Sequence, residues 1–336
     1  MRTAFRLTAL VAVGGILAAS LAGCSVAAST RHLDSGGAGR SGRGPDGGTG
    51  QAARKPASQP AFKTLAVTST PTRIAAKAGV LADPRTLRLL WSRQPYTERP
   101  IGSLAKVMTA LVVLRTADLS RQVRIPRAVL GYVAKYHGES AGLHPGDVLT
   151  VRDLLEALLV ESACDAAYVL ATTFGPGIGA FVAKMNAAAR QLGMMHTQFT
   201  SPDGLPYPTQ YSTFSTPADL LTLGLAAMKS SVFRSIVARR FYQVRKSKGQ
   251  HHAYWWGNTN ALIGSYRGAD GIKTGYTDAA LHCLLFEAAR HDVTLIGVVL
   301  GSPATGPEAA AQAAARLLNW GFSLKLAPGG PAMAHR

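Results

Sequence analysis

The chain has 336 residues, 47% of them hydrophobic, which is enough for a sizeable core in one large domain or two modest ones. Lys and Arg number 36 against 18 Asp and Glu, so the formal net charge is +18. That excess favours an anionic partner, such as lipid or a polymer. Nucleic acid is the weaker option, because the sequence has no Arg/Lys-rich helix with interleaved aromatic residues and no zinc-ligand spacing.

The first 23 residues have the pattern of a signal peptide. Arg2 and Arg6 precede an apolar run at 7–22 that is too short to span a bilayer comfortably. The run ends in LAGC at 21–24, which resembles a bacterial lipobox, so we expect Cys24 to be lipidated and to become the mature N-terminus. An ordinary signal peptide or an uncleaved anchor is the alternative. In each case the mature protein is expected outside the cytoplasmic membrane.

Composition then divides the chain into a tether, a folded domain and a tail. Residues 24–72 are rich in Gly, Ser, Pro and Ala and predict a disordered tether. Order is expected from Arg73, with one domain over 73–322 and a disordered tail over 323–336. Only Cys164 and Cys283 follow Cys24. In an exported chain they could form a disulfide, and two separate buried thiols are the alternative.

The predicted elements change character along the domain. Thr150 and Asp153 predict a capped helix start, and so does Thr216 before Pro217. Residues 124–147 are expected to be irregular. Helices are predicted at 104–115, 151–160, 165–172, 181–192, from 216, and at 307–318. Strands are predicted at 78–83, 86–91, 240–244, 271–275, 281–288 and 293–300. Strands at both ends predict an α/β (α+β) fold, in which N- and C-terminal strands form one antiparallel sheet around a mostly helical insertion.

Ser103 is placed at or near a helix N-terminus by the breakers Pro100 and Gly102, and Lys106 follows one turn later on the same face. A hydroxyl there lies beside unpaired backbone N–H groups that can hold an oxyanion, and an amine within one turn can take its proton if its charged form is disfavoured. Ser-x-x-Lys alone occurs by chance in many chains, and a serine at a helix start is commonly a cap.

Two later motifs change that balance. Ser162 lies between two predicted helices, and Lys273-Thr274-Gly275 lies on a predicted strand. The set S-x-x-K, S-x-N and K-T-G, in this order, is found in penicillin-binding proteins and β-lactamases. The flanking sequences RPIGSLAKVMTAL at 99–111, SAGLHPG at 140–146, SPDGLP at 201–206, NTN at 258–260 and GIKTGYT at 271–277 match further. Together they resemble the D-alanyl-D-alanine carboxypeptidase family of low-mass penicillin-binding proteins, over residues 75–322.

The resemblance implies a β-lactamase/transpeptidase-like fold and a reaction on the D-Ala-D-Ala end of peptidoglycan stem peptides. Ser103 would attack the carbonyl between the two D-Ala residues, with Lys106 as base. Ser162 would relay a proton to the leaving amine. Water would hydrolyse the acyl-enzyme, and β-lactams would acylate the same serine. No metal or cofactor is implied.

The resemblance also assigns the substrate-binding residues. Lys273 and Thr274 would bind the terminal carboxylate. Gly275 would remove a side chain that would crowd the substrate. The backbone N–H groups of Ser103 and Tyr276 would form the oxyanion hole. Asn258 and Asn260 are interpreted as structural, holding the loop before the strand.

Cys164 departs from the family pattern, which has Asn at this third position of the second motif. Asn would bind the substrate backbone and Lys106, whereas a thiol is a weak donor and acceptor. The residue is therefore assigned to substrate binding with altered rate or preference.

Three other functions remain open. A β-lactamase would share the motifs, but no convincing Glu-x-x-Leu-Asn loop for its water-activating carboxylate is present. A D,D-endopeptidase would use the same residues on cross-links. A non-catalytic wall-binding lipoprotein is disfavoured by the intact serines and lysines.

Overall fold

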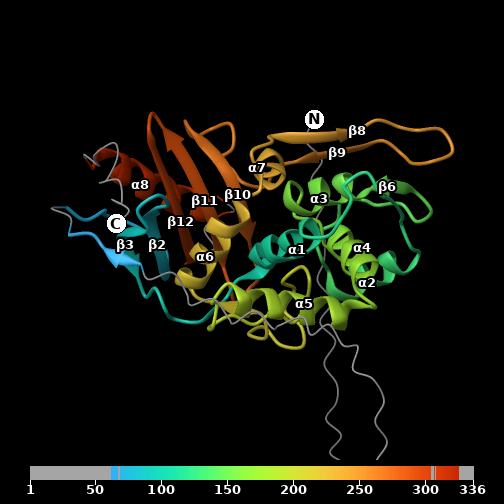
Figure 1. Cartoon of the computed structure of the whole chain (residues 1–336), viewed down its shortest axis with the longest axis horizontal. Coiled ribbons are helices and arrows are strands. Elements are labelled where there is room, and N and C mark those ends of the chain that lie inside the picture. The colour runs from blue at the N-terminus through green and yellow to red at the C-terminus, as the bar shows by residue number, and fades with distance from the viewer. Residues whose placement is uncertain (1–61, 67–68, 304–305, 307, 325–336) are drawn as a thin grey trace, which may run out of the picture. The chain divides into compact units, whose positions relative to one another are not determined.

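A computed structural model of the chain describes residues 62–66, 69–303, 306 and 308–324 (Figure 1). The predicted signal peptide, Cys24 and most of the predicted tether lie outside these residues. The sheet begins earlier than expected, because Lys63–Thr64 forms strand β1 and pairs in parallel with β3. Within the described part of the chain, no single helix is both long enough and apolar enough to cross a membrane.

One six-stranded sheet joins the two ends of the folded chain, in the order β1-β3-β2-β12-β11-β10. Every pairing other than β1 with β3 is antiparallel. The N- and C-terminal strands meet where Ile296 of β12 faces Ala82 of β2, which confirms the predicted composite sheet. The main strands are β2 (Ala78–Asp83), β3 (Arg88–Arg93), β10 (Ala269–Gly275), β11 (His282–Arg290) and β12 (Val293–Ser302).

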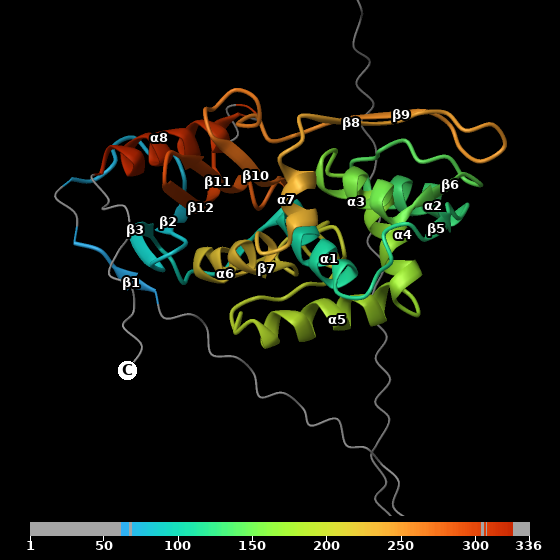
Figure 2. The same ribbon diagram turned by 45° about the horizontal axis from the view of Figure 1, so that its top comes forward.

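Alternation of side chains along the strands gives the sheet two apolar faces. On β11, Leu284 and Phe286 belong to the core under helix α8 (Ala309–Ser323), whereas Leu285 belongs to the larger core of the helical region. Figure 2 shows α8 on one side of the sheet and α6 (Pro217–Ala227) on the other. The sheet is therefore the middle layer between helices.

The helical region lies between β3 and β10 in the sequence, as predicted. Its helices are η1 (Gly102–Leu104), α1 (Ala105–Leu114), α2 (Ala128–Tyr136), α3 (Val151–Leu159), α4 (Cys164–Phe174), α5 (Ile178–Gln191), α6 and α7 (Ser231–Val237). Three short ribbons accompany them: β4 (Arg99–Pro100) with β7 (Phe214–Ser215), β5 (Gln122–Arg124) with β6 (Val148–Thr150), and β8 (Phe241–Val244) with β9 (Tyr254–Gly257).

The predicted helix starts are confirmed at two positions. The Thr150 side chain accepts the Asp153 N–H, and the Asp153 carboxylate accepts the Thr150 N–H, so the box is complete at α3. Thr216 accepts the Asp219 N–H at the start of α6, with Pro217 in the first turn. These caps satisfy donors that a helix end leaves open.

The expectation of an irregular segment at 124–147 was wrong for α2. Only Val129 of this helix is buried, so its sequence has no clear apolar stripe, and Pro126 and Gly131 obscure the pattern further. Strand β9 was also missed. It pairs with β8 through a long connecting loop at 245–253, so the sequence lacks the two-residue turn that marks a tight β-hairpin.

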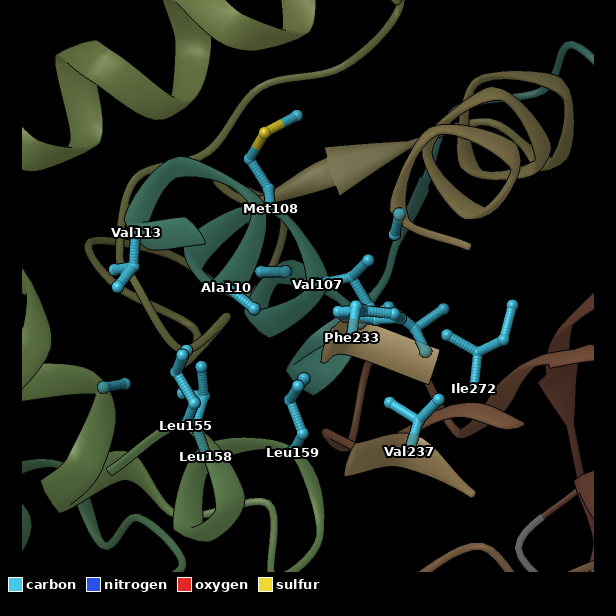
Figure 3. Packing of buried hydrophobic residues seen from close by; sticks show 14 of the residues in the cluster. Val107, Met108, Ala110, Val113, Leu155, Leu158, Leu159, Phe233, Val237 and Ile272 are labelled. Carbon is cyan, nitrogen blue, oxygen red and sulfur yellow. The ribbon is translucent and has the colours of Figure 1, made fainter. Parts of the chain in front are cut away.

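Helix α1 runs through the centre of the helical region, and its lysine side is fully enclosed. In Figure 3 its apolar side chains lie among those of α3, α7 and β10. Labelled there are Val107, Met108, Ala110 and Val113 of α1 with Leu155, Leu158, Leu159, Phe233, Val237 and Ile272. Residues 105–110 of α1 are buried throughout, so a residue at the start of the helix is kept in a fixed position.

Candidate active site

The predicted serine and lysine lie in direct contact. Ser103 is half-buried in η1, and the Nζ of Lys106, which is fully buried in α1, donates to its Oγ over 2.7 Å. Lys106 Nζ also donates to the backbone oxygen of Asp203 (3.1 Å) and to the Sγ of Cys164 (3.3 Å). The amine is thus fixed by three partners and points at the serine.

Two glycines allow the turn at Ser103 to be packed tightly. Gly102 has φ of +51°, and a Cβ there would lie 2.9 Å from the backbone nitrogen of Tyr276. Gly204 has φ of +84°, and a Cβ there would lie 1.9 Å from the carbonyl oxygen of Gly102. The end of β10 and the 201–206 loop therefore press against this turn from different elements.

The predicted rigid loop at 201–206 holds Lys106 through Asp203. The Asp203 carboxylate accepts the hydroxyl of Tyr132 (2.6 Å) and the N–H of Leu205 (3.1 Å). Burial, with the charge of Asp203, raises the pKa of Tyr132, so its hydroxyl stays a donor. Sequence reasoning found the loop but gave no role to Asp203 or Tyr132, since the two residues are 71 positions apart in the chain and nothing local marks their contact.

Ser162 lies between α3 and α4 in a left-handed conformation, with φ of +66°, and is 5% exposed. A non-glycine residue is uncommon in this region, so the surrounding structure must hold it there. Close by, Asp165 ties the loop at 140–143 to the start of α4, because its carboxylate accepts the Ser140 hydroxyl at 2.6 Å and the N–H groups of Ala141 and Leu143.

Lys273 and Thr274 lie side by side on the edge strand β10. Lys273 is 1% exposed, and its Nζ donates to the backbone oxygen (3.1 Å) and the Oγ1 (3.2 Å) of Thr274. Burial and the charge of Lys106 lower the pKa of Lys273 well below its usual range. The hydroxyls of Thr274 and Thr259 are 2.7 Å apart, which adds a third polar group.

Gly275 lines the cavity, as the expected role at the substrate requires, and it also has a packing role. A Cβ on it would lie 2.5 Å from the carbonyl oxygen of Ile101 and 3.2 Å from the Leu104 nitrogen. The missing side chain therefore lets β10 approach the turn of Ser103. Tyr276 follows, 49% exposed, with its ring 4.7 Å from that of His282.

Cys164 is 1% exposed, contacts Lys106 and is not among the residues that line the cavity beside Ser103, so its position does not support the expected direct contact with substrate. Burial raises the pKa of its thiol to about 12. The hypothesis of a bond to Cys283 was wrong: both are free, buried thiols, and Cys283 lies against the Ala280 carbonyl at 3.5 Å.

A cavity of about 310 Å³ brings the predicted residues together. Ser103, Ser162, Thr274, Gly275 and Tyr276 all line it, whereas both lysines lie beneath the surface. The other lining residues are Glu139, Thr259, Ala261, His282, Cys283, Leu284, Ala310 and Ala311. Glu139 was not foreseen, because nothing in its local sequence marks it.

The asparagines of the loop before β10 serve the predicted structural role. Asn260 Nδ2 donates to the Gly271 carbonyl at 3.0 Å, and Asn258 Nδ2 donates to the carbonyls of Val237 and Arg239. Within the described ranges, no group of three or more His, Cys, Asp or Glu side chains is placed to hold a metal ion.

Comparison with known sequences identifies one family. A profile of the D-alanyl-D-alanine carboxypeptidase family matches residues 65–304. A relative from Streptomyces sp. strain K15, named D-alanyl-D-alanine carboxypeptidase, is 39% identical over 272 residues, covering 78% of this chain and 92% of the relative. A D-alanyl-D-alanine endopeptidase of Escherichia coli is 29% identical over 277 residues, covering 81% and 86%.

Solved structures agree with the sequence comparison. The crystal structure of the Streptomyces K15 DD-transpeptidase superimposes with a TM-score of 0.72 at 38% identity, covering 76% of this chain and all of that one. A penicillin-binding protein homolog of Mycobacterium tuberculosis gives a TM-score of 0.69 at 34% identity, covering 80% and 97%. The described fold is therefore that of penicillin-binding peptidases.

Proposed function

Because the chain belongs to the family of D-alanyl-D-alanine carboxypeptidases, serine peptidases of the cell wall that bind penicillin, we propose that its own Ser103 and Lys106 carry out that reaction. The observation that carries the proposal is the 2.7 Å contact between Lys106 Nζ and Ser103 Oγ, beside a cavity that Ser162 and Thr274 also line. The substrate is the D-Ala-D-Ala end of a peptidoglycan stem peptide.

In the acylation step, Ser103 Oγ attacks the carbonyl carbon between the two D-Ala residues, and its proton passes to Lys106 Nζ. The fixed partners of Lys106 keep the amine aligned with the hydroxyl. The negative charge on the carbonyl oxygen is held by the N–H groups of Ser103 and Tyr276. The contact of Gly102 with the Tyr276 backbone supports this pairing, since it sets both groups at one turn.

Release of D-Ala requires a proton on the leaving amine and a partner for its carboxylate. Ser162 lines the same cavity and relays to the leaving amine the proton that Lys106 took from Ser103, so both side chains return to their starting protonation states. Lys273 and Thr274 bind the carboxylate, with Thr259 as a further hydroxyl donor. A buried ammonium is a strong partner for an anion when the bound carboxylate replaces lost solvent. Water then hydrolyses the ester on Ser103, and a β-lactam forms a longer-lived ester there.

The decisive experiment is the intact mass of the mature protein after mixing with benzylpenicillin. Wild type is expected to gain the mass of one penicilloyl group, and Ser103→Ala none. D-Ala release from a stem pentapeptide then follows the same dependence on Ser103. Rapid loss of penicillin with no adduct would show a β-lactamase instead, and neither adduct nor turnover would reject an enzyme function.

A second outcome for the same acyl-enzyme is transfer to an amine. The solved Streptomyces K15 structure is named a DD-transpeptidase, and an endopeptidase is among the relatives. Adding glycine or a D-amino acid as acceptor to the pentapeptide assay separates the two: hydrolysis gives the tetrapeptide, and transfer gives its aminolysis product.

We also propose that the protein is held at the outer face of the cell membrane by a lipid on Cys24, with residues 24–61 as the tether. The support is the apolar run that ends at this cysteine and the Gly/Ser/Pro-rich sequence after it. Cys24→Ala is expected to move the protein from the membrane fraction to the soluble extracytoplasmic fraction. Unchanged membrane association would reject the lipid anchor.

A further inference from the structure

Among the described residues that line the catalytic cavity, Glu139 is the only one with a carboxylate. The cavity lining contains no Lys or Arg, and its one imidazole belongs to His282. Burial lowers the pKa of His282, which disfavours the charged form of that imidazole. Lys106 and Lys273 lie beneath the lining. An acid at this place runs against the charge of a chain with a net +18.

The backbone at Glu139 is fixed. Its carbonyl accepts the N–H of Cys164 at 2.7 Å. The next residue, Ser140, donates to Asp165 at 2.6 Å. On the other side, a Cβ at Gly138 would lie only 2.9 Å from the Cβ of Cys164. The loop is therefore packed onto the start of α4, and it holds the exposed Glu139 side chain at the wall of the cavity.

The Glu139 carboxylate has no partner of its own among the described residues: it takes part in no ion pair and no side-chain hydrogen bond there. Its charge nevertheless reaches the catalytic groups. Burial and Lys106 lower the pKa of Lys273, and Glu139 is among the groups that oppose this shift. An unpaired carboxylate within electrostatic reach of the reacting atoms is available to a cation on the substrate.

We propose that Glu139 selects stem peptides whose residue before the D-Ala-D-Ala pair carries a free ammonium group, that is, a diamino acid. The inference rests on the proposed function. There, Lys273 and Thr274 take the carboxylate of the leaving D-Ala, and the acyl portion of the peptide lies along the rest of the wall, where Glu139 is. A flexible side chain ending in an ammonium can then pair with its carboxylate.

The test compares two tripeptides that differ by one charge: Nα-acetyl-L-Lys-D-Ala-D-Ala and its Nα,Nε-diacetyl analogue. We expect wild type to show kcat/KM about fivefold higher for the free amine, as suits a partly exposed ion pair. In Glu139→Gln the ratio of the two kcat/KM values falls to about one. In Glu139→Lys the preferred substrate becomes an Nε-succinyl peptide, whose side chain carries a carboxylate in place of the ammonium. Glu98→Gln removes an equal charge outside the cavity and retains the wild-type ratio.

The preference for the free amine should also shrink as salt is raised from 0.1 to 1 M, because both charges face solvent. Equal rates for the two peptides in wild type, or an unchanged ratio in Glu139→Gln, would overturn the role of Glu139. Benzylpenicillin acylation of Ser103 is measured in the same samples. If acylation and hydrolysis occur without charge discrimination, only this inference fails; if neither occurs in wild type, the proposed function fails.

Discussion

Lys273 illustrates how burial of a single residue links binding and stability. The proposed binding of a carboxylate needs its ammonium, yet burial and Lys106 lower its pKa well below the usual value. Between that lowered pKa and the ordinary one, the unfolded chain binds more protons than the folded one. The contribution of Lys273 to stability therefore rises with pH in this window, while its affinity for an anion falls.

We predict that KM for an acyl-D-Ala-D-Ala peptide rises by up to about tenfold per pH unit above the lowered pKa of Lys273. The same peptide with a C-terminal carboxamide lacks the anion and provides the control. Any effect of pH that acts through Lys106 is common to the two peptides. The ratio of the two KM values between pH 6 and 10 is the measurement. A ratio that stays constant would remove Lys273 from carboxylate binding.

At the scale of elements, the site depends on backbone segments that nearly touch. The loop at 201–206 and the turn at Ser103 come within van der Waals reach only because Gly204 has no side chain. The same loop supplies the carbonyl of Asp203 to Lys106. Displacing it should therefore affect chemistry as well as packing.

Gly204→Ala is expected to lower stability by about 3 kcal/mol or more, because its Cβ would overlap the Gly102 carbonyl and its φ is positive. Acylation by benzylpenicillin should slow by about a hundredfold through misplacement of the turn. Gly142→Ala is the matched control, with φ of +70° and no atom within 4 Å of the added carbon. It should cost about 1 kcal/mol and keep the acylation rate. Equal behaviour of the two variants would contradict the steric argument.

Helix α3 contains a buried acid, Glu156, whose carboxylate lies 3.1 Å from Nε of Arg239 and 3.9 Å from Nε of Arg152. Burial outweighs these cations and raises the pKa of Glu156 to about 7. The folded state thus keeps a proton that the unfolded state loses near its ordinary pKa of 4.5. Stability is expected to fall as pH rises through this window, by up to about 3 kcal/mol from this group.

Urea unfolding at pH 5 and pH 8 measures this effect. Glu156→Gln should reduce the loss of stability between the two values, whereas the exposed Glu98→Gln should leave it as in wild type. Part of the loss will remain in Glu156→Gln, because burial also raises the pKa of Glu287 to about 7. If Glu156→Gln shows the full wild-type loss, the carboxyl is ionised in the folded state at pH 5.

A feature of this protein could be predicted from the sequence when the residues that form it lie close together along the chain. The cap at Thr150 and the pair Ser103 and Lys106 are local patterns, and the structure has them as predicted. Tyr132 on Asp203 and Glu139 in the cavity wall are contacts between distant segments, for which a single sequence has no local mark. The packing role of Gly275 was not foreseen for the same reason, since the atom that an added side chain would meet belongs to Ile101.

At the scale of the whole molecule, the net charge of +18 predicts adhesion to anionic wall polymers or lipids. Binding to lipoteichoic acid should be measurable at 0.1 M salt and lost at 1 M, as the screening length falls from about 10 Å to about 3 Å. Sedimentation with the polymer at the two salt concentrations is the measurement. Binding that persists at 1 M would indicate a specific site in place of general charge.

The pairing of β2 with β12 sets the time at which this protein can become active during its synthesis. Ser103 is synthesised early, but β12, the strand that pairs with the N-terminal strand β2, ends only at Ser302. At usual elongation rates, on the order of tens of seconds separate the two. A chain stopped anywhere before β12 therefore carries Ser103 without the framework around it, and catalytic competence arrives only when nearly the whole protein has been translated.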